Sequence, residues 1–375
     1  MRAGIIGGGF MALVHARALR ALGVEVAGVA SSSQASAVMA AERIGATRAF
    51  PTVGELIASS DVEVVHVCSP NSTHATFAAQ AVAAGKAVVC EKPLATTVED
   101  ALRLARAASE AGVPTAVPFV YRFYPVVREI RARVMRGDIG RPLLLHGSYL
   151  QDWLADPAET DWRVSSTLGG ASRAFADIGV HWCDVVEFVT GQRITRLNAK
   201  MTTAFGSRGN EPESVETEDI VTMMFETDGQ ASGSLMVSQV SSGRKNRLAF
   251  SIDGEAGALA FNQEEPNTLW AGSTTENRII HTGSSAMSLG DVQRLTLLPP
   301  GHPQGYQDAF NAFLADAYGR FEGLPVRDVP TFEDGLRAAL LTDAVTRSSQ
   351  LESWVDVSSL TRVAAPVSSV QAPVS

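Results

Sequence analysis

The chain has 375 residues, which at about 150 residues per domain suggests two domains or one large one. Hydrophobic residues make up 45% and charged residues 19%, a globular composition that excludes a chain disordered throughout. The net charge of −9 argues against a nucleic-acid binder, which needs a basic surface. The three cysteines are scattered singly, so neither a disulfide framework nor a zinc site is indicated. We expect a cytoplasmic protein without a bound metal.

The N-terminus permits one alternative location. Arg2 and the uncharged run that follows it loosely resemble a signal peptide, and residues 16–18 resemble its cleavage site. Three consecutive glycines interrupt this run, and glycine destabilises a helix by roughly 1 kcal/mol relative to alanine. No segment has the roughly 20 apolar residues of a membrane span. We therefore expect no association with a membrane.

The first third of the chain alternates short apolar runs with helical patterns, as parallel β-α-β units do. Thr96 and Glu99 form a capping box for the last of these helices. The predicted strands are 3–6, 24–30, 62–68, 87–90 and 115–121, and the predicted helices are 10–22, 34–44, 73–84 and 98–111. The pattern predicts a Rossmann domain with a doubly wound parallel sheet over residues 1–122.

The middle of the chain changes to strands separated by turn signals, which indicates an antiparallel sheet. These strands are predicted at 143–149, 194–203, 220–225, 231–239, 246–252 and 258–261. Residues 264–305 are predicted to form a long loop, and helices return at 306–319 and 332–349. We interpret 123–357 as an α+β domain for substrate binding and oligomerisation, and 358–375 as a loosely ordered tail.

A glycine-rich turn follows the first predicted strand. Gly7, Gly9 and Ala12 match the G-x-G-x-x-A form of the dinucleotide fingerprint. Gly7 permits the tight turn and Gly9 lets the main chain approach a pyrophosphate, while the helix that begins near Phe10 and Met11 presents free N–H groups to it. The alternative is a glycine-rich turn without a ligand.

Ser31, Ser32 and Ser33 follow the second strand, where a site that prefers NAD usually has Asp or Glu. The serines can bond a 2′-phosphate, but no Arg or Lys stands immediately beside them in the sequence. NAD and NADP both remain open, with a slight preference for NADP.

Two polar motifs end neighbouring strands, at the edge where such sheets bind ligands. Glu91-Lys92-Pro93 ends one strand, and Ser69-Pro70-Asn71 with His74 follows the strand before it. A lone lysine in a loop is usually only solvated, but the stiff turn at Pro93 favours a directed ammonium group.

A third motif lies in the second half of the chain. Asp177, His181 and Asp184 share one face if the segment is helical. A carboxylate beside an imidazole can orient it as a general acid or base. The alternative is an ordinary polar helix face, and a metal site is less favoured because no second His or Cys is close.

In this order, the motifs resemble the Gfo/Idh/MocA (glucose–fructose oxidoreductase, inositol dehydrogenase, rhizopine catabolism) family. The matching residues are the glycine turn, Pro70-Asn71 with His74, Glu91-Lys92-Pro93, Arg122, Pro125 and Asp177-x-Gly179-x-His181, and they extend the match over residues 2–356. Residues 147–153 with 162–163 further resemble its sugar-dehydrogenase branch. The resemblance implies NAD(P)-linked oxidation or reduction of a sugar or cyclitol, and a homodimer or homotetramer formed through the C-terminal sheet.

The resemblance also implies roles for individual residues. Lys92, Asp177 and His181 become the catalytic candidates. His181 is expected to be the base and Lys92 to bond the substrate oxygen, while Asp177 orients His181 or bonds a neighbouring hydroxyl. Pro70, Asn71, His74, Glu91 and Lys92 join Gly7, Gly9, Phe10, Met11 and the three serines as cofactor contacts, and Arg122, Trp153, Trp162 and Arg163 are candidate substrate contacts. Core packing is the alternative for the tryptophans. A non-catalytic sensor and a lyase or glycosidase-like enzyme that recycles NAD in place remain as other functions.

Overall fold

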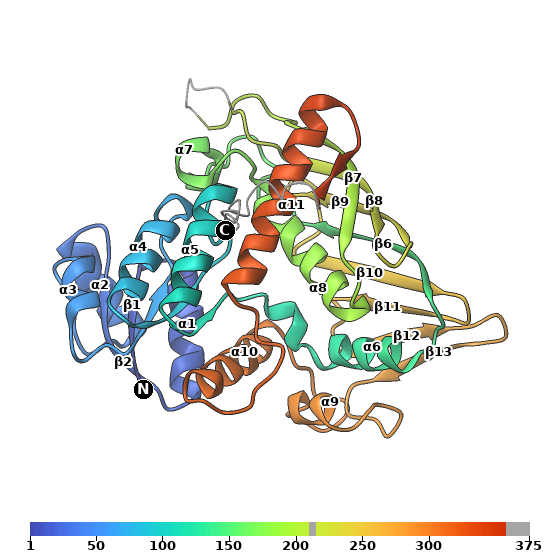
Figure 1. The fold of residues 1–375 in the computed structure, drawn as a ribbon, viewed down its shortest axis with the longest axis horizontal. Coiled ribbons are helices and arrows are strands. Elements are labelled where there is room, and N and C mark those ends of the chain that lie inside the picture. The colour runs from blue at the N-terminus through green and yellow to red at the C-terminus, as the bar shows by residue number, and fades with distance from the viewer. Residues whose placement is uncertain (210–214, 358–375) are drawn as a thin grey trace, which may run out of the picture.

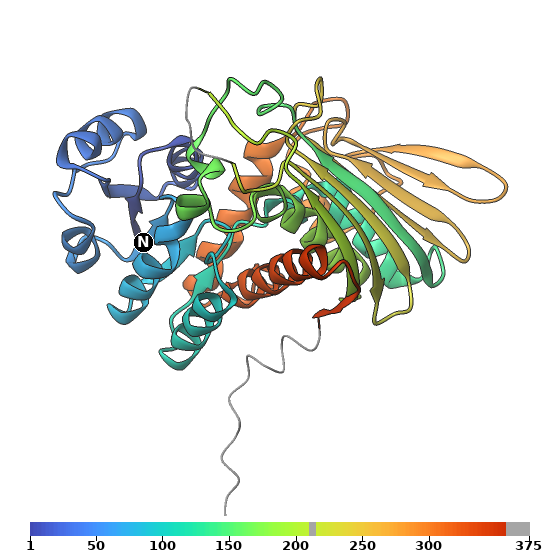
Figure 2. The same cartoon turned by 90° about the horizontal axis from the view of Figure 1, so that it is seen from above.

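The computed structural model describes residues 1–209 and 215–357. They form a five-stranded and a nine-stranded sheet, which lie at opposite ends of the molecule in Figures 1 and 2. The tail predicted at 358–375 lies outside the described residues.

The first sheet is parallel throughout, with strand order β2-β1-β3-β4-β5. Its strands are β1 (Arg2–Ile6), β2 (Glu25–Ala30), β3 (Val64–Val67), β4 (Ala87–Cys90) and β5 (Thr115–Ala116), and its helices are α1 (Phe10–Ala21), α2 (Gln34–Ile44), α3 (Val53–Ala58), α4 (Asn71–Ala83) and α5 (Val98–Glu110). After β1 the chain continues to β2 on one side of the sheet, and after β3 it continues to β4 on the other side. The topological switch point therefore lies between β1 and β3, and sheets of this kind bind ligands at the carboxyl ends of these strands. The predicted Rossmann fold is confirmed.

Two local predictions in this domain were wrong. The cap of α5 is Thr97, whose side chain accepts a hydrogen bond from the main chain of Asp100, one residue later than the predicted box. Strand β5 ends at Ala116 instead of continuing to residue 121, and a 3-10 helix, Val120–Phe123, follows. The strand stops because Val117 donates its N–H to Pro330 outside the sheet, and Pro118 has no N–H to donate.

The second sheet has the order β13-β12-β11-β10-β6-β9-β8-β7-β14, with every described pair antiparallel except β6–β9. Its strands are β6 (Pro142–Leu150), β7 (Ile194–Thr202), β8 (Ile220–Thr227), β9 (Ser232–Ser238), β10 (Arg247–Gly254), β11 (Ala258–Asn262), β12 (Thr268–Gly272), β13 (Asn277–His281) and β14 (Val355–Asp356). Side chains alternate between buried and exposed along the central strands, because helices cover one face only (Figure 2). The predicted, mostly antiparallel C-terminal sheet is confirmed.

The covering helices are α6 (Pro125–Arg136) and α8 (Val180–Thr190), with α11 (Phe332–Leu351) against β7. The loop predicted at 264–305 was wrong, because this segment contains β12, β13 and the short helix α9 (Asp291–Leu295). Its polar side chains belong to an edge of the sheet, where one face meets water. No helix in the described part of the chain is long and apolar enough to cross a membrane.

The last two long helices return to the first domain. Helix α10 (Tyr306–Phe321) packs on α1, and α11 packs on α5 as well as on the second sheet (Figure 1). The C-terminal third of the chain therefore joins the two halves and closes one side of the space between them.

Candidate active site

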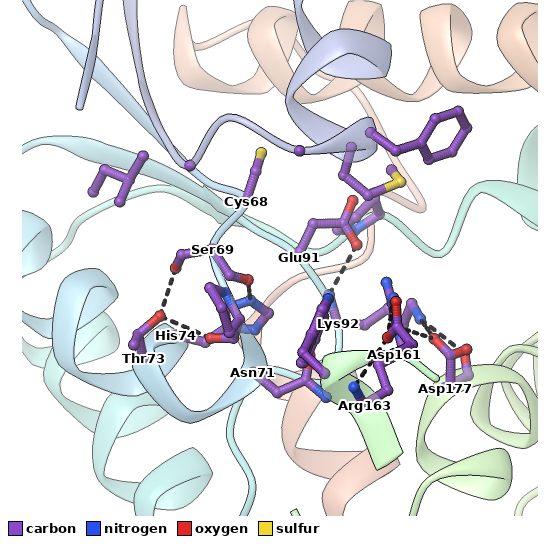
Figure 3. A pocket seen from close by; sticks show the side chains of 18 of the residues that line it. Cys68, Ser69, Asn71, Thr73, His74, Glu91, Lys92, Asp161, Arg163 and Asp177 are labelled. Atoms are coloured by element: carbon purple, nitrogen blue, oxygen red, sulfur yellow. Dashed lines mark hydrogen bonds and ion pairs between the residues drawn. The ribbon is translucent and has the colours of Figure 1, made fainter. Parts of the chain in front are cut away.

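A cavity of about 930 Å³ lies where the carboxyl ends of β1, β3 and β4 meet the second half of the chain (Figure 3). Most of the predicted site residues line it together. They are Gly7, Gly9, Phe10, Met11, Ser31, Ser32, Pro70, Asn71, His74, Glu91, Lys92, Trp162, Arg163, Asp177 and His181. The structure thus brings the three sequence motifs to one place.

The glycine turn forms one end of this cavity. Gly7 has a φ of +109°, and a Cβ there would lie 2.5 Å from the carbonyl oxygen of Cys68, so only glycine fits between β1 and β3. Gly9 is the N-cap of α1, and a Cβ on it would meet no atom within 4 Å. The turn is therefore open on the side where main-chain N–H groups at the start of α1 face the cavity.

The central feature of the site is the contact between Lys92 and Asp177. The Lys92 ammonium group donates to Oδ1 of Asp177 at 2.7 Å and to its main-chain oxygen at 2.8 Å. Burial by itself would raise the pKa of the Asp177 carboxyl, but the charges of Lys92 and Arg163 lower it to about 2. The carboxylate therefore stays ionised, and the third N–H of Lys92 remains available for a ligand.

His181 lies one turn after Asp177, and its ring packs edge-on against Phe119 and Tyr121. Burial lowers the pKa of its imidazole to about 3, with a further contribution from the charge of Lys92. Its Nδ1 atom is buried and has no hydrogen-bond partner among the described residues. The ring is neutral at ordinary pH, which is the form that accepts a proton.

Sequence reasoning missed two residues, of which one holds Asp177 directly and the other holds the start of the turn that carries it. Gln239, fully buried after β9, donates to the second carboxylate oxygen of Asp177 at 2.8 Å. Glu218 accepts hydrogen bonds from the Ser172 hydroxyl and from the main chain of Arg173 and Phe175, at the start of the π-helical turn Phe175–Gly179. Neither belongs to a local motif, and a glutamine that ends a strand carries no spacing signal.

A hydrogen-bonded cluster of polar side chains also lines the cavity. The amide oxygen of Asn246 accepts from the hydroxyl of Tyr149 at 2.7 Å and from the amide of Gln151 at 2.8 Å. Tyr121 lies 2.5 Å from the Tyr149 hydroxyl and also lines the cavity. The segment 147–153 contains two of these residues, so the sequence indicated this region but not which side chains face the cavity.

Arg122 is not in the cavity lining, which corrects its prediction as a substrate contact, and Asp184 also lies outside the lining. The Arg122 guanidinium group bonds both oxygens of Asp184 and also Asp334 on α11, and these side chains are largely buried. Asp184 leaves the face shared by Asp177 and His181, because the π-helical turn at 175–179 has a wider spacing than the α-helix that follows. Arg122 therefore joins α8 to α11.

Trp153 and Ser33 also lie outside the cavity lining. The indole N–H of Trp153 donates to Gln151 at 2.9 Å, so Trp153 lies behind a lining residue. The Ser33 side chain caps α2 through the main chain of Ser36. Trp162 and Arg163 do line the cavity, where the Arg163 guanidinium group stacks on the Trp162 ring and pairs with Asp161.

His74 joins the two strand-end motifs. One ring nitrogen lies 2.7 Å from the carbonyl oxygen of Pro93, and the other lies 2.8 Å from that of Ser69. Asn71 in turn donates to the carbonyl of Gly169 in α7 (Ser166–Gly169), on the other side of the cavity. These contacts fix the turn that carries Lys92, visible in Figure 3.

Comparison with known proteins places both halves of the chain in one family. Residues 1–119 match the "Oxidoreductase family, NAD-binding Rossmann fold", and residues 127–260 match the "GFO/IDH/MocA C-terminal domain". The chain belongs to the Gfo/Idh/MocA oxidoreductase family. This confirms the family resemblance and the prediction of an NAD-binding oxidoreductase with a Rossmann domain.

Individual members of the family resemble the chain over most of its length. Levoglucosan dehydrogenase of Pseudarthrobacter phenanthrenivorans is 31% identical over 95% of this chain and 98% of its own. A structure of levoglucosan dehydrogenase with NADH and levoglucosan has a TM-score of 0.88 at 31% identity, over 95% of this chain and 98% of that one. An inositol 2-dehydrogenase of Acidothermus cellulolyticus is 32% identical over 71% of this chain and 74% of its own.

Proposed function

We propose that this chain transfers hydride between a nicotinamide cofactor and the secondary alcohol carbon of an uncharged sugar or cyclitol. The observation that carries the proposal is the cluster of Lys92, Asp177 and His181 in a cavity continuous with the open glycine turn. The similarity to levoglucosan and inositol dehydrogenases supports the same class of substrate.

The glycine turn and its surroundings fit a dinucleotide. The open space beside Gly9 admits a pyrophosphate next to the start of α1, and the adenosine ribose falls beside Ser31 and Ser32, which line the cavity at the end of β2. When bound, the nicotinamide ring supplies the site that gives or accepts the hydride.

The cofactor preference is the finer part of the proposal. No acid follows β2 to repel a 2′-phosphate, and Arg43 on α2 reaches the carbonyl oxygen of Gly9 at 3.3 Å. Arg43 is distant from Ser31 and Ser32 in the sequence, but helix α2 places its guanidinium group at the glycine turn, close to these serines. We infer a preference for NADP over NAD, which kinetics with both cofactors will test.

The chemistry of the protein groups follows from their charges. In the oxidising direction, the neutral imidazole of His181 accepts the proton of the substrate hydroxyl. Lys92 donates a hydrogen bond to the same oxygen and stabilises its developing negative charge. Asp177 holds the ammonium group of Lys92 through its Oδ1 atom, while Gln239 fixes the other carboxylate oxygen.

The lining of the cavity favours an uncharged substrate. Among the described residues that line the cavity, Lys92 and Arg163 are the only lysine and arginine, and each already pairs with a carboxylate. A phosphate on the sugar would find no free cation here. Tyr149, Gln151 and Asn246 instead offer neutral groups that match several hydroxyls.

The decisive experiment is a panel of monosaccharides, anhydrosugars, inositols and sugar phosphates with NAD⁺ and NADP⁺, followed by the nicotinamide absorbance. We expect turnover of an uncharged member with release of reduced cofactor. Binding of sugar without turnover would indicate a sensor. Product formation with the cofactor retained on the protein would indicate a lyase or glycosidase-like enzyme.

We further propose that a second copy of this chain covers the exposed face of the nine-stranded sheet. The strand register puts five apolar side chains on this face, of which Met224, Met236 and Ile279 are more than half exposed. The five are Leu144, Met224, Met236, Trp270 and Ile279. Exposed apolar patches of this kind mark protein interfaces. Light scattering should show a dimer or tetramer, and Met224→Glu with Met236→Glu should release smaller species.

A further inference from the structure

A chain of buried polar groups runs from helix α10 to the carboxylate beside Lys92. The Tyr318 hydroxyl lies 2.8 Å from Nε2 of His66, and Nδ1 of His66 lies 2.7 Å from Nδ1 of His15. Nε2 of His15 then lies 3.0 Å from Oε1 of Glu91. Both imidazoles are completely buried.

If each imidazole carries a single proton, these contacts have one consistent direction. The Glu91 carboxylate can only accept, so His15 donates through Nε2. A neutral imidazole carries one proton, so Nδ1 of His15 accepts from Nδ1 of His66, and Nε2 of His66 accepts from the Tyr318 hydroxyl. Burial, together with the neighbouring His15, lowers the pKa of His66 well below 6.5, which keeps that ring neutral.

This chain is not required for packing. His66 lies in β3 between valines, and an apolar side chain would fill the same place in a buried parallel strand. Burying a polar group lowers the stability of the fold unless the group is hydrogen-bonded. Loss of one member of this chain would therefore leave its neighbour buried without a partner. Its only end in the cavity lining is Glu91.

Glu91 connects the chain to the proposed chemistry. One carboxylate oxygen accepts from His15, and the other lies 3.3 Å from the main-chain nitrogen of Lys92. Figure 3 shows Lys92 with Glu91 on one side and Asp177 on the other. Glu91 therefore connects the buried polar groups to the main chain of the residue that carries the ammonium group.

We propose that Tyr318 is a positioning residue for Lys92 and acts on it through His66, His15 and Glu91. The inference rests on the role given to Lys92 in the proposed function. Helix α10 already contributes Tyr306 to the cavity lining, and the inference gives it a second, indirect part through Tyr318, more than 200 residues from Lys92 in the sequence.

The first test removes the Tyr318 hydroxyl with Tyr318→Phe. Because a small displacement of a reacting group is costly, we expect kcat to fall about tenfold while affinity for the dinucleotide is unchanged. Tyr124→Phe is the matched control, since Tyr124 is equally buried but takes no part in the chain. An unchanged kcat in Tyr318→Phe, or an equal loss in both variants, would overturn the proposal.

The second test asks whether Tyr318 acts through Glu91, which it does not touch. Tyr318→Phe should lower kcat much less in a Glu91→Gln background than in the wild type, because both changes disturb the same chain. An equal loss in both backgrounds overturns the proposal. Lys92→Ala distinguishes a failure of this inference from a failure of the proposed function. Full activity in Lys92→Ala would refute the proposed function itself.

The third test uses the unmodified protein and does not depend on the folding of a variant. Selective ¹⁵N labelling of histidine, followed by NMR above the ordinary imidazole pKa, reports which ring nitrogen carries the proton. We expect the proton on Nδ1 in His66 and on Nε2 in His15. A proton on Nε2 of His66 would reverse the chain and overturn the proposal.

Discussion

The ammonium group of Lys92 lies 2.7 Å from the carboxylate of Asp177, although 85 residues separate them in the chain. Lys92 follows strand β4 of the Rossmann sheet, and Asp177 belongs to the π-helical turn before α8. Together with the hydrogen bond from Asn71 to Gly169, this contact joins the two halves of the protein at the cavity. It also sets the charge around His181, because Lys92 lowers the pKa of the imidazole and Asp177 raises it.

Loss of either Lys92 or His181 should disable the same step. Lys92→Ala and His181→Ala should each lower kcat by about 10²- to 10⁴-fold, and the double variant should fall little further. Steady-state kinetics measures this, and calorimetry should show that the dinucleotide still binds all three variants. Lys200→Ala, an exposed lysine on β7, is the control. Multiplicative losses in the double variant would mean that the two groups act independently.

Removing the charge of Lys92 should change the titration of its neighbours. Burial and Lys92 both hold the pKa of His181 down at about 3, so Lys92→Met should raise it. The same change should raise the pKa of Asp177 from about 2, because a cation that stabilises the carboxylate is lost. NMR titration of the His181 ring tests the first shift. An unmoved imidazole would show that burial alone sets its pKa.

The same groups predict how stability depends on pH. The folded pKa of His181 lies below the ordinary 6.5, so the unfolded state binds more protons between about 6.5 and 3. The contribution of His181 to stability is therefore fully present above 6.5 and is lost as the pH falls to about 3. Asp177 adds a second loss from about 3.8 to 2. Urea unfolding over this range should show a smaller loss between pH 6.5 and 3 for His181→Ala than for the wild type.

Gly9→Val should abolish dinucleotide binding without unfolding the protein. The new side chain would enter open space beside the turn, where the pyrophosphate must approach the main chain. Gly305→Val is a close control, since Gly305 is also an N-cap with no atom near its hypothetical Cβ, but lies outside the cavity lining. If calorimetry shows unchanged affinity for the dinucleotide in a folded Gly9→Val protein, the dinucleotide does not bind at this turn.

Ser32→Asp should shift the cofactor preference towards NAD. An added carboxylate beside the ribose repels a 2′-phosphate and can bond the two hydroxyls of NAD instead. The ratio of kcat/KM for the two cofactors measures the shift, and Arg43→Gln should move it in the same direction. If neither change alters the ratio, the serines and Arg43 do not contact that part of the cofactor.

Arg122→Met should lower the stability of the fold and leave KM for the substrate nearly unchanged. The variant leaves the buried carboxylate of Asp184 without its partner, which should lower the free energy of unfolding by about 3 kcal/mol or more. Urea denaturation measures this loss. Arg103→Met removes two ion pairs of an exposed arginine on α5, with Glu99 and Asp100, and should change stability by less than about 1 kcal/mol. Near-normal stability together with a raised KM would instead indicate that Arg122 contacts the substrate.

Much of the Rossmann domain was predictable because its signals are local. The bounds of α2 and β4 agree with the sequence prediction, since a serine cap, a glycine with positive φ and a run of buried apolar residues act within a few residues. The glycine turn, Lys92 and His181 were found for the same reason. Each belongs to a short motif whose spacing follows from the strand or helix that carries it.

Contacts between distant segments were decided only by the tertiary structure. The sequence does not reveal that Pro330 ends β5, that Gln239 holds Asp177, or that Arg122 turns to Asp184 instead of the substrate. Tyr318 reaches His66 because α10 packs against the first domain. Periodicity and caps reflect interactions within one turn or one strand, whereas these pairings depend on how sheets and helices pack across the whole chain. The sequence by itself therefore determined the motifs and their elements, and tertiary packing determined which side chains line the cavity and which support it from behind.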